Sequence, residues 1–194
     1  MPLNVPNILT LLRVAVIPLV LILFYLPWPY SREAAATLFA AAAITDWVDG
    51  WLARRLGQTS KFGAFLDPVA DKLLVAVCLV MLLHDAAELA RSPILAALVA
   101  IIIGREITIS ALREWMAELG QRTSVAVGVV GKVKTGFQMV AILLMLWQEP
   151  IYALPIYDLG FALLFVAAAL TVYSMVVYLR AAWPFMREDH QLGA

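Results

Sequence analysis

Four aspartates stand out because they lie in a chain that is otherwise largely apolar. They are Asp46, Asp49, Asp67 and Asp71, all within residues 45–72. The first pair is three residues apart and the second pair four, so each pair can share one face of a helix. Ionised carboxylates near hydrocarbon cost at least a few kcal/mol each, and four together repel one another. Hard divalent cations, Mg2+ or Mn2+, are the natural compensation, because they prefer oxygen ligands and bridge carboxylates to phosphates.

The aspartates have a second interpretation, as partners in salt bridges at a membrane interface. Arg54, Arg55 and Lys72 lie close enough in sequence to supply the cations. Small residues favour the metal site, since Gly50 and Ala53 share the helical face of the first aspartate pair and leave room for a ligand. Gly50 also has a simpler interpretation, in helix packing alone.

Composition limits the other chemistries. The chain has 2 histidines, neither near the aspartates in sequence, which argues against a zinc site. Its 1 cysteine excludes an intrachain disulfide framework. Its formal net charge is +0, so it lacks the global basic excess that nucleic-acid phosphates attract. No nucleic-acid partner is expected.

The elements that must hold the aspartates are membrane helices. The chain is 63% hydrophobic and 14% charged, with a mean hydropathy of +0.89, which is typical of an integral membrane protein. We predict a single all-α domain over residues 1–194, with six transmembrane helices and no internal repeat. The apolar segments are predicted at about residues 7–26, 31–56, 61–83, 93–114, 125–147 and 157–183.

Two boundaries need comment. Pro68 disfavours a helical Asp67, so the third helix either starts at Pro68 with Asp67 as its cap, or starts earlier and bends there. Residues 115–124 are expected to form a polar connection.

The basic residues predict the orientation. With six spans, all but two of the 14 lysines and arginines fall on the side that holds both termini, the exceptions being Arg32 and Arg91. This asymmetry predicts cytoplasmic termini in a multi-pass protein of the cytoplasmic membrane. The four aspartates then lie near the cytoplasmic interface.

These residues match a family pattern. The motif D-x-x-D-G-x-x-A-R, a gap of eight residues and then G-x-x-x-D-x-x-x-D are present without departure. The matching positions are Asp46, Asp49, Gly50, Ala53, Arg54, Gly63, Asp67 and Asp71. The motif resembles the signature of the CDP-alcohol phosphatidyltransferases, and eight fixed positions make it specific. The runs at residues 7–13, 105–115 and 124–135 are similar to bacterial members that use glycerol 3-phosphate, and the resemblance covers about residues 3–183.

The resemblance implies transfer of the phosphatidyl group from CDP-diacylglycerol, a membrane lipid, to sn-glycerol 3-phosphate. It implies two metal ions, Mg2+ or Mn2+, on the four aspartates, with Asp71 also the catalytic base, and a homodimer. The residues assigned to CDP-diacylglycerol are Asn7, Thr10, Gly50, Ala53, Arg54 and Gly63. Asn7, Thr10 and Arg13 would line the cytosolic mouth of the site, although capping of the first helix is an alternative for Asn7 and Thr10.

An acceptor that carries a phosphate requires a second cationic site. The candidates are Arg105, Arg113, Lys132 and Lys134. The arginines rank above the lysines because a guanidinium makes a forked contact with phosphate. Each candidate can instead be a topological anchor, or a partner for Glu106 or Glu114.

Three other functions compete with this assignment. A sister transferase with another acceptor, such as serine or inositol phosphate, would carry the same signature. A cation transporter would place its acids through the bilayer depth, whereas these acids cluster at one interface. A structural membrane protein would tolerate loss of the aspartates.

Overall fold

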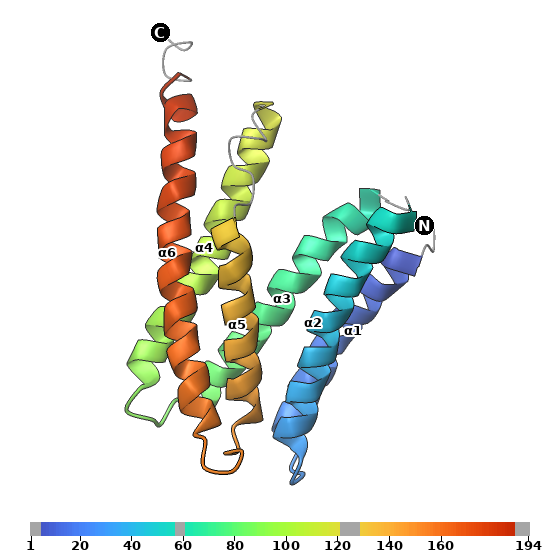
Figure 1. Ribbon diagram of the computed structural model, residues 1–194, viewed down its shortest axis with the longest axis vertical. Coiled ribbons are helices and arrows are strands. Elements are labelled where there is room, and N and C mark those ends of the chain that lie inside the picture. Colours follow the sequence, from blue (N-terminus) through green and yellow to red (C-terminus); the bar gives the residue numbers. More distant parts are fainter. Residues whose placement is uncertain (1–4, 57–60, 121–128, 189–194) are drawn as a thin grey trace. The chain divides into compact units, whose positions relative to one another are not determined.

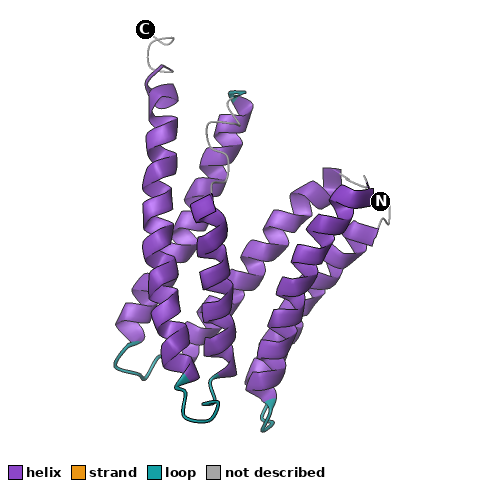
Figure 2. Ribbon diagram, in the orientation of Figure 1, coloured by secondary structure: helices purple, strands orange, loops and turns teal. Residues whose placement is uncertain are grey.

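Helices joined by short loops make up the part of the chain that the structure describes (Figure 2). The structure, a computed structural model, describes residues 5–56, 61–120 and 129–188, with side chains described for 8–45, 63, 65–120 and 133–185. Within these residues the helices are α1 (Val5–Tyr25), α2 (Ser31–Leu56), α3 (Lys61–Asp85), α4 (Ser92–Glu118), α5 (Val129–Trp147) and α6 (Ile156–Glu188). The all-α prediction is confirmed at this level.

The helices divide into two compact units. The first comprises Met1–Leu89 and Met139–Ala162, and the second comprises Ala90–Gln138 and Leu163–Ala194. The division therefore passes through α5 and α6. The assignment of residues 1–194 to one domain stays a prediction.

In the first unit, α1 packs against both α2 and α3 (Figure 1). Its core is formed by fully buried side chains, among them Phe24 of α1, Phe39 of α2 and Leu79 of α3. Ala35 and Ala36 of α2 are completely buried. Alanine at these positions lets neighbouring backbones approach closely, which is how membrane helices pack when the surrounding lipid is as apolar as the core.

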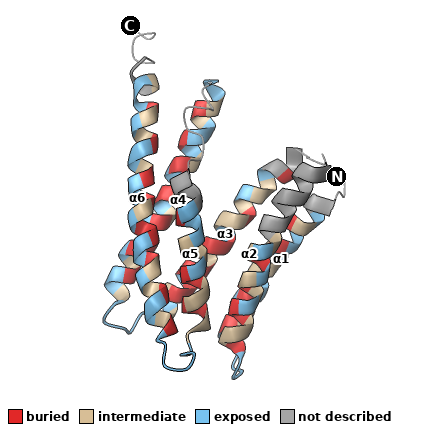
Figure 3. Cartoon of the chain, viewed as in Figure 1, coloured by how far each residue is buried: buried red, intermediate tan, exposed pale blue. Residues whose placement is uncertain are grey.

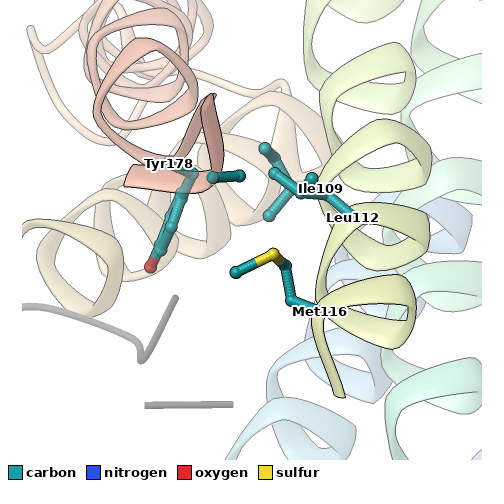
Figure 4. Close-up of a cluster of buried hydrophobic side chains, with 5 residues drawn as sticks. Ile109, Leu112, Met116 and Tyr178 are labelled. Carbon is teal, nitrogen blue, oxygen red and sulfur yellow. The ribbon is translucent and has the colours of Figure 1, made fainter. Parts of the chain in front are cut away.

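In the second unit, α4 and α6 share an apolar cluster (Figure 4). Ile109, Leu112 and Met116 lie on one face of α4, and they pack with Tyr178 and Ala182 of α6. Buried and exposed residues alternate around the helices at helical spacing (Figure 3). The buried face of α4 also includes one charged residue, Arg105.

Several boundaries differ from the sequence prediction. The third helix begins at Lys61 and continues through Pro68, so Asp67 lies inside α3 and is not its cap. The prediction of a polar connection from residue 115 was wrong, because α4 continues to Glu118 and Met116 is fully buried against α6. α6 continues to Glu188, with Pro184 inside it.

Three of the described helices are long and apolar enough to cross a membrane: α1, α4 and α6. Residues 133–147 of α5 form a shorter apolar helix. These apolar helices indicate a membrane protein.

Candidate active site

Two aspartates of the signature are held by α1. The hydroxyl of Thr10 donates a hydrogen bond to Oδ1 of Asp67. One turn further along each helix, Nη1 of Arg13 donates to Oδ1 of Asp71 at 2.8 Å. The spacings of three residues on α1 and four on α3 place both pairs on facing sides of the two helices.

Burial differs sharply across these pairs. Thr10 is 1% exposed and Arg13 is 3% exposed, whereas Asp67 and Asp71 are of intermediate exposure. The side chain of Asp71 is 35% exposed against 2% for that of Arg13. The α1 groups therefore act as an interior support, and the carboxylates remain accessible from outside the helix pair.

Thr10 has a different role from helix capping. α1 begins at Val5, so the hydroxyl of Thr10 lies a full turn inside the helix and bonds to another helix. The prediction that Thr10 and Arg13 line the mouth of the site did not identify their aspartate partners. The signal was present in the sequence, because both are polar, at helical spacing, in a strongly apolar segment.

The other signature residues lie on α2. Asp46, Asp49, Gly50, Ala53 and Arg54 all fall within the helical range Ser31–Leu56, so the predicted helical spacing is confirmed for the backbone. Their side chains lie outside the described residues, as do those of Asn7 and Lys132. Gly63 is buried near the start of α3.

The described part of the site fits a hard divalent cation. Asp67 and Asp71 present carboxylate oxygens four residues apart on one helix, which suits Mg2+ or Mn2+. Among the described side chains no group of three histidines, cysteines or acids comes together. The other two aspartates of the motif, Asp46 and Asp49, lie on α2, and their side chains fall outside the described residues.

A second polar cluster lies in the other unit, around Glu106 of α4. Oε1 of Glu106 accepts a hydrogen bond from Nη1 of Arg105 at 2.8 Å and one from Nζ of Lys134 at 2.6 Å. Arg105 is 7% exposed and Lys134 is 2% exposed. The two cations and one carboxylate leave one positive charge in excess, buried among α4, α5 and α6, and such a site favours an anion.

Arg105 is also fixed by α6. Its Nη2 donates to Oγ of Ser174 at 3.1 Å, and its guanidinium carbon lies 5.8 Å from the centroid of the Tyr178 ring. Sequence reasoning missed both α6 residues. The available signal was weak, namely the hydroxyl residues Thr171 and Ser174 at helical spacing inside a long apolar helix.

The four predicted acceptor residues are not equivalent. Arg105 and Lys134 are joined through Glu106, as described above. Arg113 lies two turns further along α4 and is exposed. Eight residues of helix rotate it away from the buried face that carries Arg105, Ile109 and Leu112. Burial therefore separates Lys134 from Arg113, and the ranking of the arginines above the lysines as acceptor ligands stays a prediction.

The described residues form helices, and α1 holds two aspartates of the motif by hydrogen bonds. Helices that carry this motif are typical of one class of membrane enzyme. A sequence model of the CDP-alcohol phosphatidyltransferases matches residues 3–177, and the chain belongs to this family.

Three individual relatives are similar to this chain over most of its length. A Pseudomonas fluorescens protein is 51% identical over 187 residues, which cover 96% of this chain and 93% of the relative. Proteins of Escherichia coli (strain K12) and Shigella flexneri are each 53% identical over 183 residues, covering 94% of this chain and 96% of the relative. All three are named CDP-diacylglycerol–glycerol-3-phosphate 3-phosphatidyltransferase.

Proposed function

We propose that this protein transfers the phosphatidyl group of CDP-diacylglycerol to sn-glycerol 3-phosphate, giving phosphatidylglycerophosphate and CMP. The observation that carries the choice of acceptor is the similarity to enzymes of that name along 94% to 96% of the chain. The buried pair of Arg105 and Lys134 supports it, because this acceptor brings a phosphate of its own.

The donor would bind at the signature. Asp46, Asp49, Asp67 and Asp71 would hold the divalent ions, and bound ions supply positive charge to the diphosphate and to the attacked phosphorus. Gly50, Ala53 and Gly63 would leave room for the cytidine, and Arg54 would contact a phosphate. Asn7 would belong to the same donor site, and Thr10 would contribute to it through its hydrogen bond to Asp67.

The transfer itself is a displacement at phosphorus. The 1-hydroxyl of glycerol 3-phosphate attacks the phosphorus that carries diacylglycerol, and the bond from that phosphorus to the oxygen of CMP breaks. Asp71 accepts the hydroxyl proton. The 2.8 Å contact from Arg13 would orient Asp71 for this step by fixing one of its carboxylate oxygens.

The acceptor phosphate would bind between Arg105 and Lys134, and Arg113 and Lys132 would supply further positive charge. Glu106 would keep the two buried cations together before the acceptor arrives, because without it they would repel each other in a poorly solvated interior.

We also propose how the helices are arranged in the membrane. All six helices would cross the cytoplasmic membrane of a bacterium, with both termini in the cytoplasm, as the distribution of lysine and arginine indicates. The active form would be a homodimer, which a mass measurement on the detergent-solubilised protein checks. Cysteine accessibility at engineered terminal sites in intact cells checks the orientation.

An acceptor panel tests the function. Purified protein in liposomes containing CDP-diacylglycerol and Mg2+ receives glycerol 3-phosphate, serine or inositol phosphate, and CMP release is measured. We expect release with glycerol 3-phosphate. Release with serine or inositol phosphate but not with glycerol 3-phosphate would assign the protein to a sister transferase, and ion flux without CMP release would indicate a transporter.

A further inference from the structure

Arg105 is held by three neighbours in the second unit. Glu106, its neighbour on α4, accepts from Nη1, and Ser174 of α6 accepts from Nη2. Tyr178, one turn beyond Ser174 on α6, places its ring 5.8 Å from the guanidinium carbon. The orientation of the guanidinium plane therefore depends on α6 as well as on the helix that carries Arg105.

Ser174 is itself oriented for this contact. Its hydroxyl donates to the backbone carbonyl of Thr171 at 3.0 Å. A hydroxyl has a single hydrogen, so once that hydrogen is committed the oxygen can only accept from other groups. The Ser174 oxygen accepts from Arg105, and Ser174 is 4% exposed, so water does not readily replace this contact.

An arginine needs such support to bind phosphate well. Its long side chain has many rotamers, and a forked contact requires the plane of the guanidinium to match the phosphate oxygens. Preorganised contacts reduce the entropy lost on binding. Nε of Arg105 is buried without a hydrogen-bond partner among the described residues. The hydrogen bonds that orient the guanidinium plane are therefore those of Nη1 and Nη2.

We infer that Ser174 is a positioning residue, which orients the guanidinium of Arg105 for the phosphate of the acceptor. The role rests on the proposed function, because it assumes that Arg105 binds the acceptor. Ser174 itself touches the arginine and the backbone of its own helix. Its effect should therefore appear in the KM for the acceptor, with little change in the kcat or in the KM for the donor.

The test compares S174A with the parent enzyme in liposomes. We expect S174A to raise the KM for glycerol 3-phosphate about five- to tenfold, the effect of losing a typical hydrogen bond, because Ser174 acts on the acceptor only through Arg105. The kcat and the KM for CDP-diacylglycerol should stay within about twofold. Partial misfolding would lower the amount of active enzyme and leave the KM for the acceptor unchanged, so that pattern overturns the inference.

T171V is the matched control. Thr171 is fully buried on the same helix, and its hydroxyl has no hydrogen-bond partner among the described residues. Valine keeps its shape and removes the hydroxyl. We expect an unchanged KM for glycerol 3-phosphate, and an increase equal to that of S174A would show that any loss of a hydroxyl from α6 has this effect.

R105K separates failure of the inference from failure of the proposed function. If R105K raises the KM for the acceptor and S174A does not, Ser174 has no positioning role, and the assignment of Arg105 to the acceptor is retained. If R105K leaves that KM unchanged, the assignment of Arg105 to the acceptor is wrong. We expect S174A to add little in the R105K background, because both changes disturb the same contact.

Discussion

Arg13 and Asp71 form an ion pair between α1 and α3 in which the cation is buried and the acid is partly exposed. The contact between Nη1 and Oδ1 is 2.8 Å, and the exposed fractions of the two side chains are 2% and 35%. Asp71, the proposed catalytic base, is thus held by a side chain that is itself almost completely buried. Thr10 supports Asp67 in the same manner.

Replacing Arg13 should impair the reaction step. R13Q removes the charge that orients Asp71, and we expect the kcat to fall about 10- to 100-fold, the usual effect of losing such a support. CMP release at saturating substrates measures it. R180Q removes an exposed arginine of α6 and serves as the control. A kcat for R13Q equal to that of R180Q would show that the ion pair has no part in catalysis.

Replacing Thr10 should weaken the response to metal. T10V keeps the shape and removes the hydroxyl that orients Asp67, so the Mg2+ concentration for half-maximal activity should rise about tenfold or more. T10S keeps the hydroxyl and should stay close to the parent enzyme. T37V is the control, because Thr37 is exposed and bonds to a carbonyl of its own helix. Equal Mg2+ titrations for T10V and T10S would contradict the support role.

The acceptor site predicts a difference between two single-charge changes. K134Q removes a buried cation that contacts Glu106, whereas R113Q removes an exposed one. We expect K134Q to raise the KM for glycerol 3-phosphate about tenfold or more, and R113Q to change it less than about threefold. Initial rates over a range of acceptor concentrations measure both. A larger increase in this KM for R113Q than for K134Q would favour the ranking of arginine above lysine.

Helix ends of the first unit carry a network with no expected role in the reaction. Asp85 at the end of α3 accepts from Arg32 of α2, and its other oxygen accepts from Nε2 of Gln148 at 2.6 Å. Arg32 also lies 3.8 Å from the centroid of the Phe24 ring. Asp85 therefore connects the start of α2, the end of α3 and the end of α5.

D85N should destabilise the protein without changing substrate binding. Loss of the charge weakens two contacts, and a cost of about 1–3 kcal/mol would lower the apparent melting temperature in detergent by about 3–10 °C. Both KM values should stay as in the parent enzyme. E88Q, a change at an exposed glutamate just after α3, is the control. Equal melting temperatures for the two variants would rule out the stabilising role.

Much of the fold followed from the sequence because its signals are local. Hydrophobic runs and turn residues predicted the helices to within a few residues at most boundaries. Pro68 left two starts open for the third helix, and the structure has the earlier one, because a helix interior tolerates proline when the rest of the helix is well packed. The extension of α4 past residue 115 depends on packing of Met116 against α6, which no local pattern reveals.

The candidate site was predictable only in part, because some of its signals are local in sequence and others depend on packing between helices. The aspartates were found from their chemistry and spacing. The partners of Asp67 and Asp71 lie 57 and 58 residues away in sequence, so pairing them requires the packing of α1 on α3. The contact of Lys134 with Glu106 and the exposure of Arg113 become known only from the packing of α4, about which side-chain type carries no information.

The most direct measurement is the yield of both products in one reaction. Protein in liposomes with CDP-diacylglycerol, Mg2+ and labelled glycerol 3-phosphate is assayed for CMP and for labelled lipid, beside D71N. The account predicts equal amounts of CMP and phosphatidylglycerophosphate, and a loss of about 10²-fold or more in D71N, as for removal of a catalytic base. CMP without labelled lipid, or full activity in D71N, would contradict it.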